Sequence, residues 1–217
     1  MDIRRADRIA DELEEMVFSH QFSDGDRLNE IKLAKKFDVS RTPIREAIQR
    51  LVFSGLAEQI PRRGVFVRQP GPVELMEMFE VMAELEAVCA RLAAMRISDQ
   101  ALVDLGDANR KCQLAVDQKD ANAYYLVNER FHNIIYQQSG NRFLASETAL
   151  LHKRLRPFRR QQLKLRGRMA QSLTEHEAIV AALEKGDPEA SANALRDHIA
   201  IQGEKFHSLM RKSSDVI

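Results

Sequence analysis

Apolar residues recur at three- and four-residue steps along most of the chain, which is the period of amphipathic helices. In the first quarter of the chain, this pattern predicts three helices, over residues 3–18, 30–37 and 41–54. Gly55 ends the third helix, and two short runs with strand character follow it, over residues 56–60 and 65–67. The basic segment 61–64 joins these runs as a turn. Three helices followed by a two-stranded hairpin predict a winged helix-turn-helix.

The rest of the chain keeps the helical period. After a stiff break at Arg68–Pro72, apolar stripes predict six helices, over residues 73–96, 98–119, 121–139, 143–165, 172–185 and 188–210. The segment Ser172–Glu175 has the form of a capping box that would open the fifth helix, and Asp187 and Pro188 suit the start of the sixth. We therefore predict a mainly α protein, in which a small β wing is the only sheet and an antiparallel all-α bundle of six or so helices follows. The predicted organisation is a DNA-binding domain, a linker and a helical domain, over residues 1–68, 69–73 and 74–212.

Composition agrees with a helical protein of two small domains. The chain has 217 residues, with 44% hydrophobic and 30% charged residues, but only nine Gly and six Pro. Its net charge is only +1, yet the segment 31–68 holds nine Lys/Arg against three Asp/Glu. Such a local cationic excess is what phosphate neutralisation requires. Cys89 and Cys112 lack a Cys-x-x-Cys spacing, the N-terminus is charged, and no apolar run approaches the roughly 20 residues that span a bilayer. We expect a cytoplasmic protein with reduced cysteines and no membrane partner.

The third predicted helix begins with cationic and hydroxyl groups. Pro43 suits its first turn, and the hydroxyl of Ser40 or Thr42 can cap it. In a helix-turn-helix, the start of the second helix of the motif meets the base edges of DNA. The wing adds arginines beside a glycine, which permits close approach to phosphates or the minor groove. The predicted DNA-binding residues are Ser40, Arg41, Thr42, Arg45, Gln49, Arg62, Arg63 and Gly64. A single arginine would fit a solvated surface helix equally well, but the combination of turn, cap, cationic helix start and basic wing favours DNA.

The motif Ser40–Ala47, together with Leu51, Gly55–Leu56 and Arg63–Gly64, resembles the GntR family of bacterial transcription regulators. The resemblance covers about the first 70 residues. It implies that the two arginines and the hydroxyl residues of the motif, with the wing glycine, contact the operator. Some members carry an arginine at the start of the second helix, where this chain has Ile31, so we expect that contact to be missing.

Histidines in the helical domain form a second candidate site. Asn128 and His132 lie four residues apart on one helical face, and His176 and His198 lie on later helices beside apolar residues. Three imidazoles and an amide oxygen that converge inside a bundle would suit a divalent transition metal with open positions for another ligand. The alternative is that each histidine is a hydrogen-bonded core residue. The remaining histidines lack such neighbours and are predicted to lie on the surface; they are His20, His152 and His207.

The segments 128–132, 175–179, 186–187 and 194–198 resemble the FCD-type effector domain of the FadR subfamily, over about residues 75–210. In metal-binding members, a carboxylate at the position of Asn128 joins the histidines, and the metal helps to hold a carboxylate effector. The resemblance implies a metal of the Zn, Ni or Mn class and a small organic acid or sugar acid as effector. Because an amide oxygen is a weaker, neutral ligand, we expect either weaker metal binding here than with Asp or a ligand role that the effector and water take over.

Basic residues crowd the segment 153–168, which contains no acidic residue. A solvated basic face is the simplest interpretation, and extra contact with DNA is a further one. A third is that Arg156 or Arg160 faces the effector cavity and pairs with an acidic group through a bidentate contact.

These features predict a ligand-responsive transcription regulator, and we expect a repressor. It would bind double-stranded operator DNA as a homodimer, because paired recognition helices match the two half-sites of a palindrome. The alternative is a metal-dependent hydrolase with an appended DNA-binding module. Against it, Glu129 points away from the His132 face and Glu175 is assigned to a cap, so no acid or base is available. A non-specific architectural DNA-binding protein is a third possibility, which a steep salt dependence without sequence preference would support.

Overall fold

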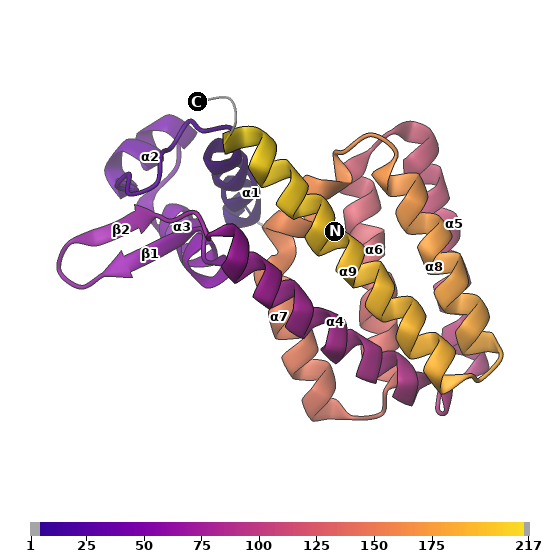
Figure 1. The fold of residues 1–217 in the computed structure, drawn as a ribbon. Coiled ribbons are helices and arrows are strands. Elements are labelled where there is room, and N and C mark those ends of the chain that lie inside the picture. The colour runs from indigo at the N-terminus through magenta and orange to yellow at the C-terminus, as the bar shows by residue number, and fades with distance from the viewer. Residues whose placement is uncertain (1–4, 215–217) are drawn as a thin grey trace. The chain divides into compact units, whose positions relative to one another are not determined.

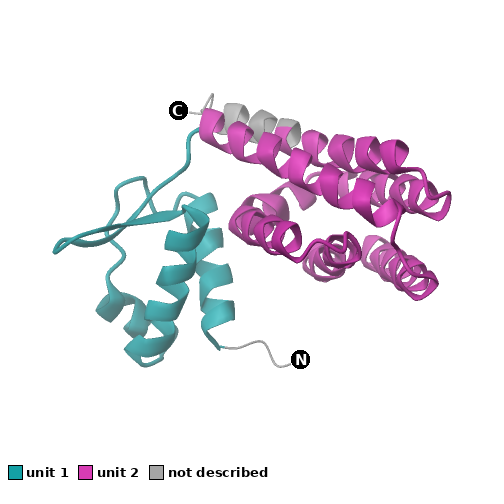
Figure 2. Ribbon diagram, turned by 90° about the horizontal axis from the view of Figure 1, so that it is seen from below, with its two compact units in different colours: residues 1–71 teal, residues 72–217 magenta. Residues whose placement is uncertain are grey.

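The computed structural model describes the backbone of residues 5–214 and the side chains of residues 5–203. Contacts divide the chain into two compact units, residues 1–71 and 72–217 (Figure 2). Ile3, where the first helix was predicted to begin, and the side chain of His207 lie outside the described part.

The first unit is a winged helix-turn-helix, as predicted. Its elements are α1 (Arg5–Phe18), α2 (Glu30–Phe37), α3 (Arg41–Ser54), β1 (Ala57–Ile60) and β2 (Gly64–Val67) (Figure 1). The two strands are antiparallel, with Ala57 opposite Val67. Leu13, Ile44 and Leu51 are fully buried, because the apolar stripes of α1 and α3 face each other. This packing leaves the outer face of α3 exposed.

The turn between α2 and α3 is set by local chemistry. Asn29 caps α2 by accepting hydrogen bonds from the backbone N–H groups of Ile31 and Lys32. Asp38 ends α2 in the left-handed conformation, at φ 49°. Ser40 occupies the N-cap position of α3 with an extended backbone, but its hydroxyl makes no capping hydrogen bond. The predicted hydroxyl cap is therefore wrong, and the Ser40 side chain is exposed instead.

The described part of the second unit, residues 72–214, contains six helices, as predicted. They are α4 (Pro72–Ala94), α5 (Asp99–Gln118), α6 (Ala121–Gln138), α7 (Arg142–Leu163), α8 (Arg168–Glu184) and α9 (Pro188–Ser214). The first helix of the unit packs most extensively against the last, and Figure 1 shows the two side by side. Ser98, Asp120 and Asn141 cap the helices that follow them, and Asp187 accepts hydrogen bonds from the first turn of α9.

One predicted boundary in this unit is wrong. The supposed capping box at Ser172–Glu175 lies inside α8, which begins at Arg168 after Gly167. Gly167 turns the chain at φ +77°, a conformation that suits glycine, and the helix starts directly after it. Ser172 is consequently buried within the helix, and Glu175 contacts Arg168 on its own helix and His198 on α9.

No helix in the described part of the chain is both long and apolar enough to cross a membrane.

Candidate DNA interface and candidate metal centre

The outer face of α3 carries the predicted reading edge. Within the recognition segment, Ser40, Arg41, Thr42, Arg45 and Gln49 are all exposed. Arg41 and Arg45 lie one helical turn apart, so their side chains project from the same face. These side chains are therefore placed where a DNA groove can reach them, and their contact with DNA stays a prediction.

Glu30 is a residue of this surface that the sequence interpretation missed. It is the first residue of α2, and its Oε2 lies 2.6 Å from Arg41 Nη2 and 2.9 Å from Arg45 Nε. The hydrogen bond from Arg41 is the largest cause that holds the pKa of Glu30 below its ordinary value. The segment with the cationic excess was taken to begin at Ile31, one residue after this carboxylate, so the acid beside the two arginines was left out. Ile31 itself is exposed at the start of α2.

The wing is a tight basic turn. Arg62 and Arg63 are exposed at its tip, and Arg62 adopts a left-handed backbone with φ 63°. Gly64 has φ +117°, and a Cβ there would lie 3.2 Å from Nε of Arg27. The glycine therefore allows both the turn and the close approach of a guanidinium, as expected for a residue without a side chain.

His132, His176 and His198 converge inside the second unit. They come from α6, α8 and α9, and each offers a ring nitrogen within 4.8 Å of the others. All three side chains are buried. The predicted histidine cluster thus exists as a group that could hold a metal ion.

Carboxylates orient two of these rings. Nδ1 of His132 lies 2.5 Å from Oε2 of Glu86, and Nδ1 of His198 lies 2.6 Å from Oε2 of Glu175. A carboxylate at Nδ1 leaves Nε2 as the lone-pair nitrogen, which is the usual arrangement behind a metal-bound histidine. The two Nε2 atoms are 3.3 Å apart. Two nitrogen ligands about 2.0–2.1 Å from one ion would lie about 3.3–3.4 Å apart in tetrahedral geometry and about 2.8–3.0 Å apart in octahedral geometry, so the spacing fits a shared ion and matches the tetrahedral arrangement best.

His176 is the member of the cluster whose surroundings fit a ligand most directly. Among the residues whose side chains the structure describes, neither of its ring nitrogens has a hydrogen-bond partner, although the side chain is fully buried. The ring stacks on Phe131, with centroids 4.0 Å apart and planes 7° apart, and so is held in place by an apolar contact. Buried polar atoms without a partner are rare and call for a water, ion or ligand.

The electrostatics favour neutral imidazoles. Burial is the largest cause that lowers the pKa of His132, His176 and His198, so these rings carry lone pairs at neutral pH. Burial alone would raise the pKa of Glu86, but His132 and Arg159 together hold that pKa well below its ordinary value. The site therefore combines neutral nitrogen ligands with an ionised carboxylate behind one of them.

Arg159 was missed within the basic run. Its Nη1 donates to Oε1 of Glu86 at 2.9 Å, and its Nη2 lies 3.2 Å from Nε2 of His132. On the neighbouring ring, Nε2 of Gln202 lies 2.9 Å from Nε2 of His198. Because carboxylates occupy the Nδ1 side of both rings, the Nε2 atoms of His132 and His198 are the acceptors. Each of them accepts a hydrogen bond from a nitrogen donor, Arg159 in one case and Gln202 in the other. An ion at the shared position would replace those two donors.

The prediction that His152 lies on the surface is wrong. It is buried on α7, and its Nδ1 lies 2.7 Å from the hydroxyl of Tyr136 and 4.0 Å from Oε1 of Glu86. Its place on the buried face of α7 explains the error, since Leu155 and Arg159 share that face. His20 is exposed, as predicted.

The other predicted site residues lie as follows. Asn128 is buried on α6, one turn before His132. Arg160 donates to Oδ1 of Asn122, and the guanidinium of Arg156 lies 6.0 Å from the ring centroid of Tyr125. Metal ligation by Asn128 and effector binding by the two arginines stay predictions.

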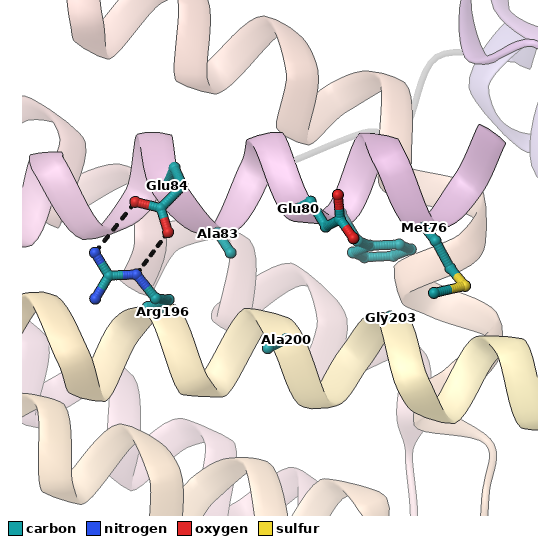
Figure 3. A pocket seen from close by; sticks show the side chains of 8 residues that line it. Met76, Glu80, Ala83, Glu84, Arg196, Ala200 and Gly203 are labelled. Carbon is teal, nitrogen blue, oxygen red and sulfur yellow. Dashed lines mark hydrogen bonds and ion pairs between the residues drawn. The ribbon is translucent and has the colours of Figure 1, made fainter. Parts of the chain in front are cut away.

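A cavity of about 430 Å³ lies elsewhere, between α4 and α9 (Figure 3). Arg196 and Glu84 form a bidentate ion pair across it, at 2.7 and 3.1 Å. Ala200 lines the same face of α9, whereas His198 and Gln202 project from another face of that helix. The cavity is therefore separate from the histidine cluster.

An exposed cationic recognition helix with a basic wing, in one chain with an all-helical unit that buries a histidine cluster, defines a DNA-binding transcriptional regulator. Comparisons with known proteins agree. Residues 77–201 match the FCD domain, and residues 5–67 match the bacterial regulatory proteins of the gntR family. The chain belongs to the GntR family of transcriptional regulators, in the FadR subfamily that carries a C-terminal FCD domain.

Three transcriptional regulators are similar over much of the chain. The Nta operon transcriptional regulator of Aminobacter aminovorans is 33% identical over 141 residues, which cover 65% of this chain and 67% of the relative. The transcriptional repressor RspR of Escherichia coli is 24% identical over 88% of this chain and 84% of its own length. The repressor NanR of Salmonella newport is 26% identical over 96% of this chain and 87% of its own length.

Solved structures support the fold. E. coli McbR/YncC superposes with a TM-score of 0.68 at 24% sequence identity, covering 91% of this chain and 94% of that protein. The relatives named here are transcriptional regulators and not enzymes, which argues against the hydrolase alternative. The predicted cap at Glu175, which was one reason to discount a hydrolase, is wrong, so the case against that alternative rests on the relatives.

Proposed function

We propose that this protein is a homodimeric repressor whose operator binding is controlled by a small carboxylate effector at a metal ion held by His132, His176 and His198. The observation that carries the proposal is the buried convergence of three neutral imidazoles, one of which finds no hydrogen-bond partner at either nitrogen among the described side chains. A dimer is proposed because a single recognition helix covers one half-site, and paired helices match half-sites about 10–10.5 base pairs apart.

The donor set favours a divalent transition metal of the Zn, Ni or Mn class, since imidazole suits these ions. Asn128 is the proposed fourth protein ligand because it precedes His132 by one turn of α6. When bound, the ion supplies positive charge and open coordination positions for a carboxylate oxygen. Glu86 and Glu175 hold the two histidine rings with Nε2 toward that position.

The site also favours an anionic effector. Arg159 is a buried cation that lies 3.2 Å from Nε2 of His132, next to the proposed ion. An arginine displaced from that nitrogen keeps donors for a carboxylate in bidentate geometry. Arg156 and Arg160 are proposed to serve a second acidic group from the rim of the site, consistent with their half-buried positions.

Metal content tests the first step. The wild type, dialysed in turn against Zn²⁺, Ni²⁺ and Mn²⁺ and then desalted, should retain about one ion per chain by elemental mass spectrometry for at least one of the three. His176→Gln should lose that ion while keeping its helical circular dichroism, and His20→Gln, which changes an exposed histidine, should retain it. Equal retention by both variants would contradict the metal site.

Effector control is tested by thermal shift with small carboxylates and sugar acids, with and without a chelator. A stabilising acid should lose its effect when the chelator removes the ion, because a ligand stabilises only the state that binds it. The same acid should change the affinity for a duplex selected from a random library. An acid that stabilises the protein equally with and without chelator would contradict the metal-held effector but leave DNA binding intact.

A further inference from the structure

One carboxylate oxygen connects the two arginines of the predicted reading edge. Oε2 of Glu30 accepts hydrogen bonds from Nε and Nη2 of Arg41, at 3.2 and 2.6 Å, and from Nε of Arg45, at 2.9 Å. The contact joins α2 to α3, so it spans the turn of the helix-turn-helix. Three donors on one oxygen restrict both guanidinium groups at once.

Local structure explains why the three side chains meet. The cap at Asn29 fixes Glu30 as the first residue of α2, where the helix dipole favours a negative charge. Arg41 and Arg45 are one turn apart on α3, so like charges would repel each other without an acid between them. The Glu30 side chain is 31% exposed, whereas the arginines are 54% and 60% exposed. The acid therefore lies beneath the cations and leaves their outer sides toward solvent.

The hydrogen bonds use particular donors. Arg45 is bound through Nε alone, and within the described residues its two Nη groups make no hydrogen bond. An arginine reads guanine through a fork of two donors to O6 and N7, so its orientation determines whether it can discriminate bases. Long exposed side chains otherwise lose rotamer entropy when DNA orders them.

We propose that Glu30 is a specificity-determining residue of the DNA interface, which positions Arg41 and Arg45 for base contacts and at the same time weakens binding to DNA of any sequence. It acts through the arginines and does not itself contact a base. A carboxylate near the phosphates opposes their approach, and this penalty applies to every sequence. Orientation of the arginines helps only at the correct bases. Glu30 thereby lowers the affinity for DNA of any sequence and increases the discrimination between the operator and other sequences.

Removal of the Glu30 carboxylate should raise affinity for DNA of any sequence and lower the preference for the operator. Glu30→Ala should bind a scrambled duplex more tightly, because one negative charge is gone. Its preference for the operator should be weaker than that of the wild type, so the ratio of the Kd for the scrambled duplex to the Kd for the operator should fall about tenfold. One bidentate base contact supplies roughly one to two orders of magnitude of discrimination, and the expected change lies within that range. Exposed ion pairs contribute little to stability, so the thermal midpoint should stay near that of the wild type.

Matched variants separate position from charge. Glu46→Ala removes the same charge from the exposed surface of α3, and within the described chain Glu46 has no ion pair with an arginine. Glu30→Asp keeps the charge but shortens the side chain by one methylene. We expect Glu46→Ala to tighten both duplexes equally with an unchanged ratio. We expect Glu30→Asp to lower the ratio without tightening the scrambled duplex.

The measurement is fluorescence anisotropy with the full chain, on a duplex selected with the wild type from a random library and on its scrambled counterpart, at several salt concentrations. An unchanged ratio in Glu30→Ala, or equal behaviour of Glu30→Ala and Glu46→Ala, would overturn the proposal. Since the inference rests on sequence-specific operator binding, a wild type that prefers no selected duplex would overturn both it and the proposed function. A lost preference confined to the Glu30 variants would support the inference and leave the proposed function intact.

Discussion

Replacement of Glu86 by leucine tests the charge balance of the helical core. Glu86 and Arg159 are 0% and 1% exposed, with 2.9 Å between Oε1 and Nη1. Glu86→Leu leaves the guanidinium buried without its counter-charge. Loss of one member of a buried ion pair costs about 3–5 kcal/mol, against a total stability of about 5–15 kcal/mol for a typical domain. We therefore expect a large fall in the free energy of unfolding of the second unit.

The double variant Glu86→Leu/Arg159→Met separates charge from packing. It removes both charges, and apolar replacement of a whole buried pair is often neutral. We expect it to recover most of the loss, which gives a coupling energy of at least about 2 kcal/mol between the two positions. Each single variant also loses side-chain contacts, and the double-mutant cycle cancels that contribution.

Tyrosine fluorescence provides the assay. The chain has no Trp, and its three tyrosines are Tyr124, Tyr125 and Tyr136, so the signal follows the second unit alone. Urea titration in the presence of a chelator removes any contribution from a bound ion to stability, and linear extrapolation gives the free energy. If Glu86→Leu lost less than about 1 kcal/mol, or if the double variant lost the sum of the two singles, the reasoning would be refuted.

Three further predictions use other parts of the chain. Burial raises the pKa of Cys89 to about 11 and that of Cys112 to about 12, so both thiols stay protonated at pH 8. Iodoacetamide should then alkylate them in urea but hardly in the native protein by mass spectrometry, and fast native labelling would contradict the buried thiols. Gly64→Ala should weaken operator binding in anisotropy titrations, because a residue with a side chain is strained at a φ of +117°. Gly71→Ala is the control and should not weaken binding, since a Cβ there meets open space. Equal affinities of the two variants would contradict a role for the wing turn. Asn128→Asp should tighten metal binding by calorimetry, since a carboxylate is the stronger ligand, and unchanged affinity would remove Asn128 from the proposed ligand set.

Helical periodicity was sufficient to predict most of the helices, because it is a local property of the sequence. A stripe of apolar residues at three- and four-residue steps requires a buried face wherever the helix finally packs. The elements of the first unit were predictable for this reason, including α2 over Glu30–Phe37. The start of α8 was not. The motif at Ser172–Glu175 satisfies a capping pattern, but Gly167 already reverses the chain five residues earlier.

The histidine cluster was predictable in part. Positions beside apolar residues placed His132, His176 and His198 in the core, but their distances depend on how α6, α8 and α9 pack. The partners Glu86 and Arg159 carried a signal that was overlooked. Each charge falls on the buried stripe of its own helix, and the two have opposite signs. Charged residues are almost never fully buried unless they are paired, so two such positions in one domain are candidates for each other.

Glu30 and Glu86 show how burial changes the consequence of the same contact. Both accept hydrogen bonds from an arginine of another helix, at 2.6 and 2.9 Å for the closest pairs. Around Glu30, water screens the charges, so the pair contributes little to stability and its effect is on orientation. Around Glu86, the low dielectric makes an unpaired charge expensive, so neither member of the pair can be removed alone without a large loss of stability. Loss of Glu30 should therefore be visible in DNA discrimination at constant stability. Loss of Glu86 should lower the free energy of unfolding, irrespective of its effect on metal binding.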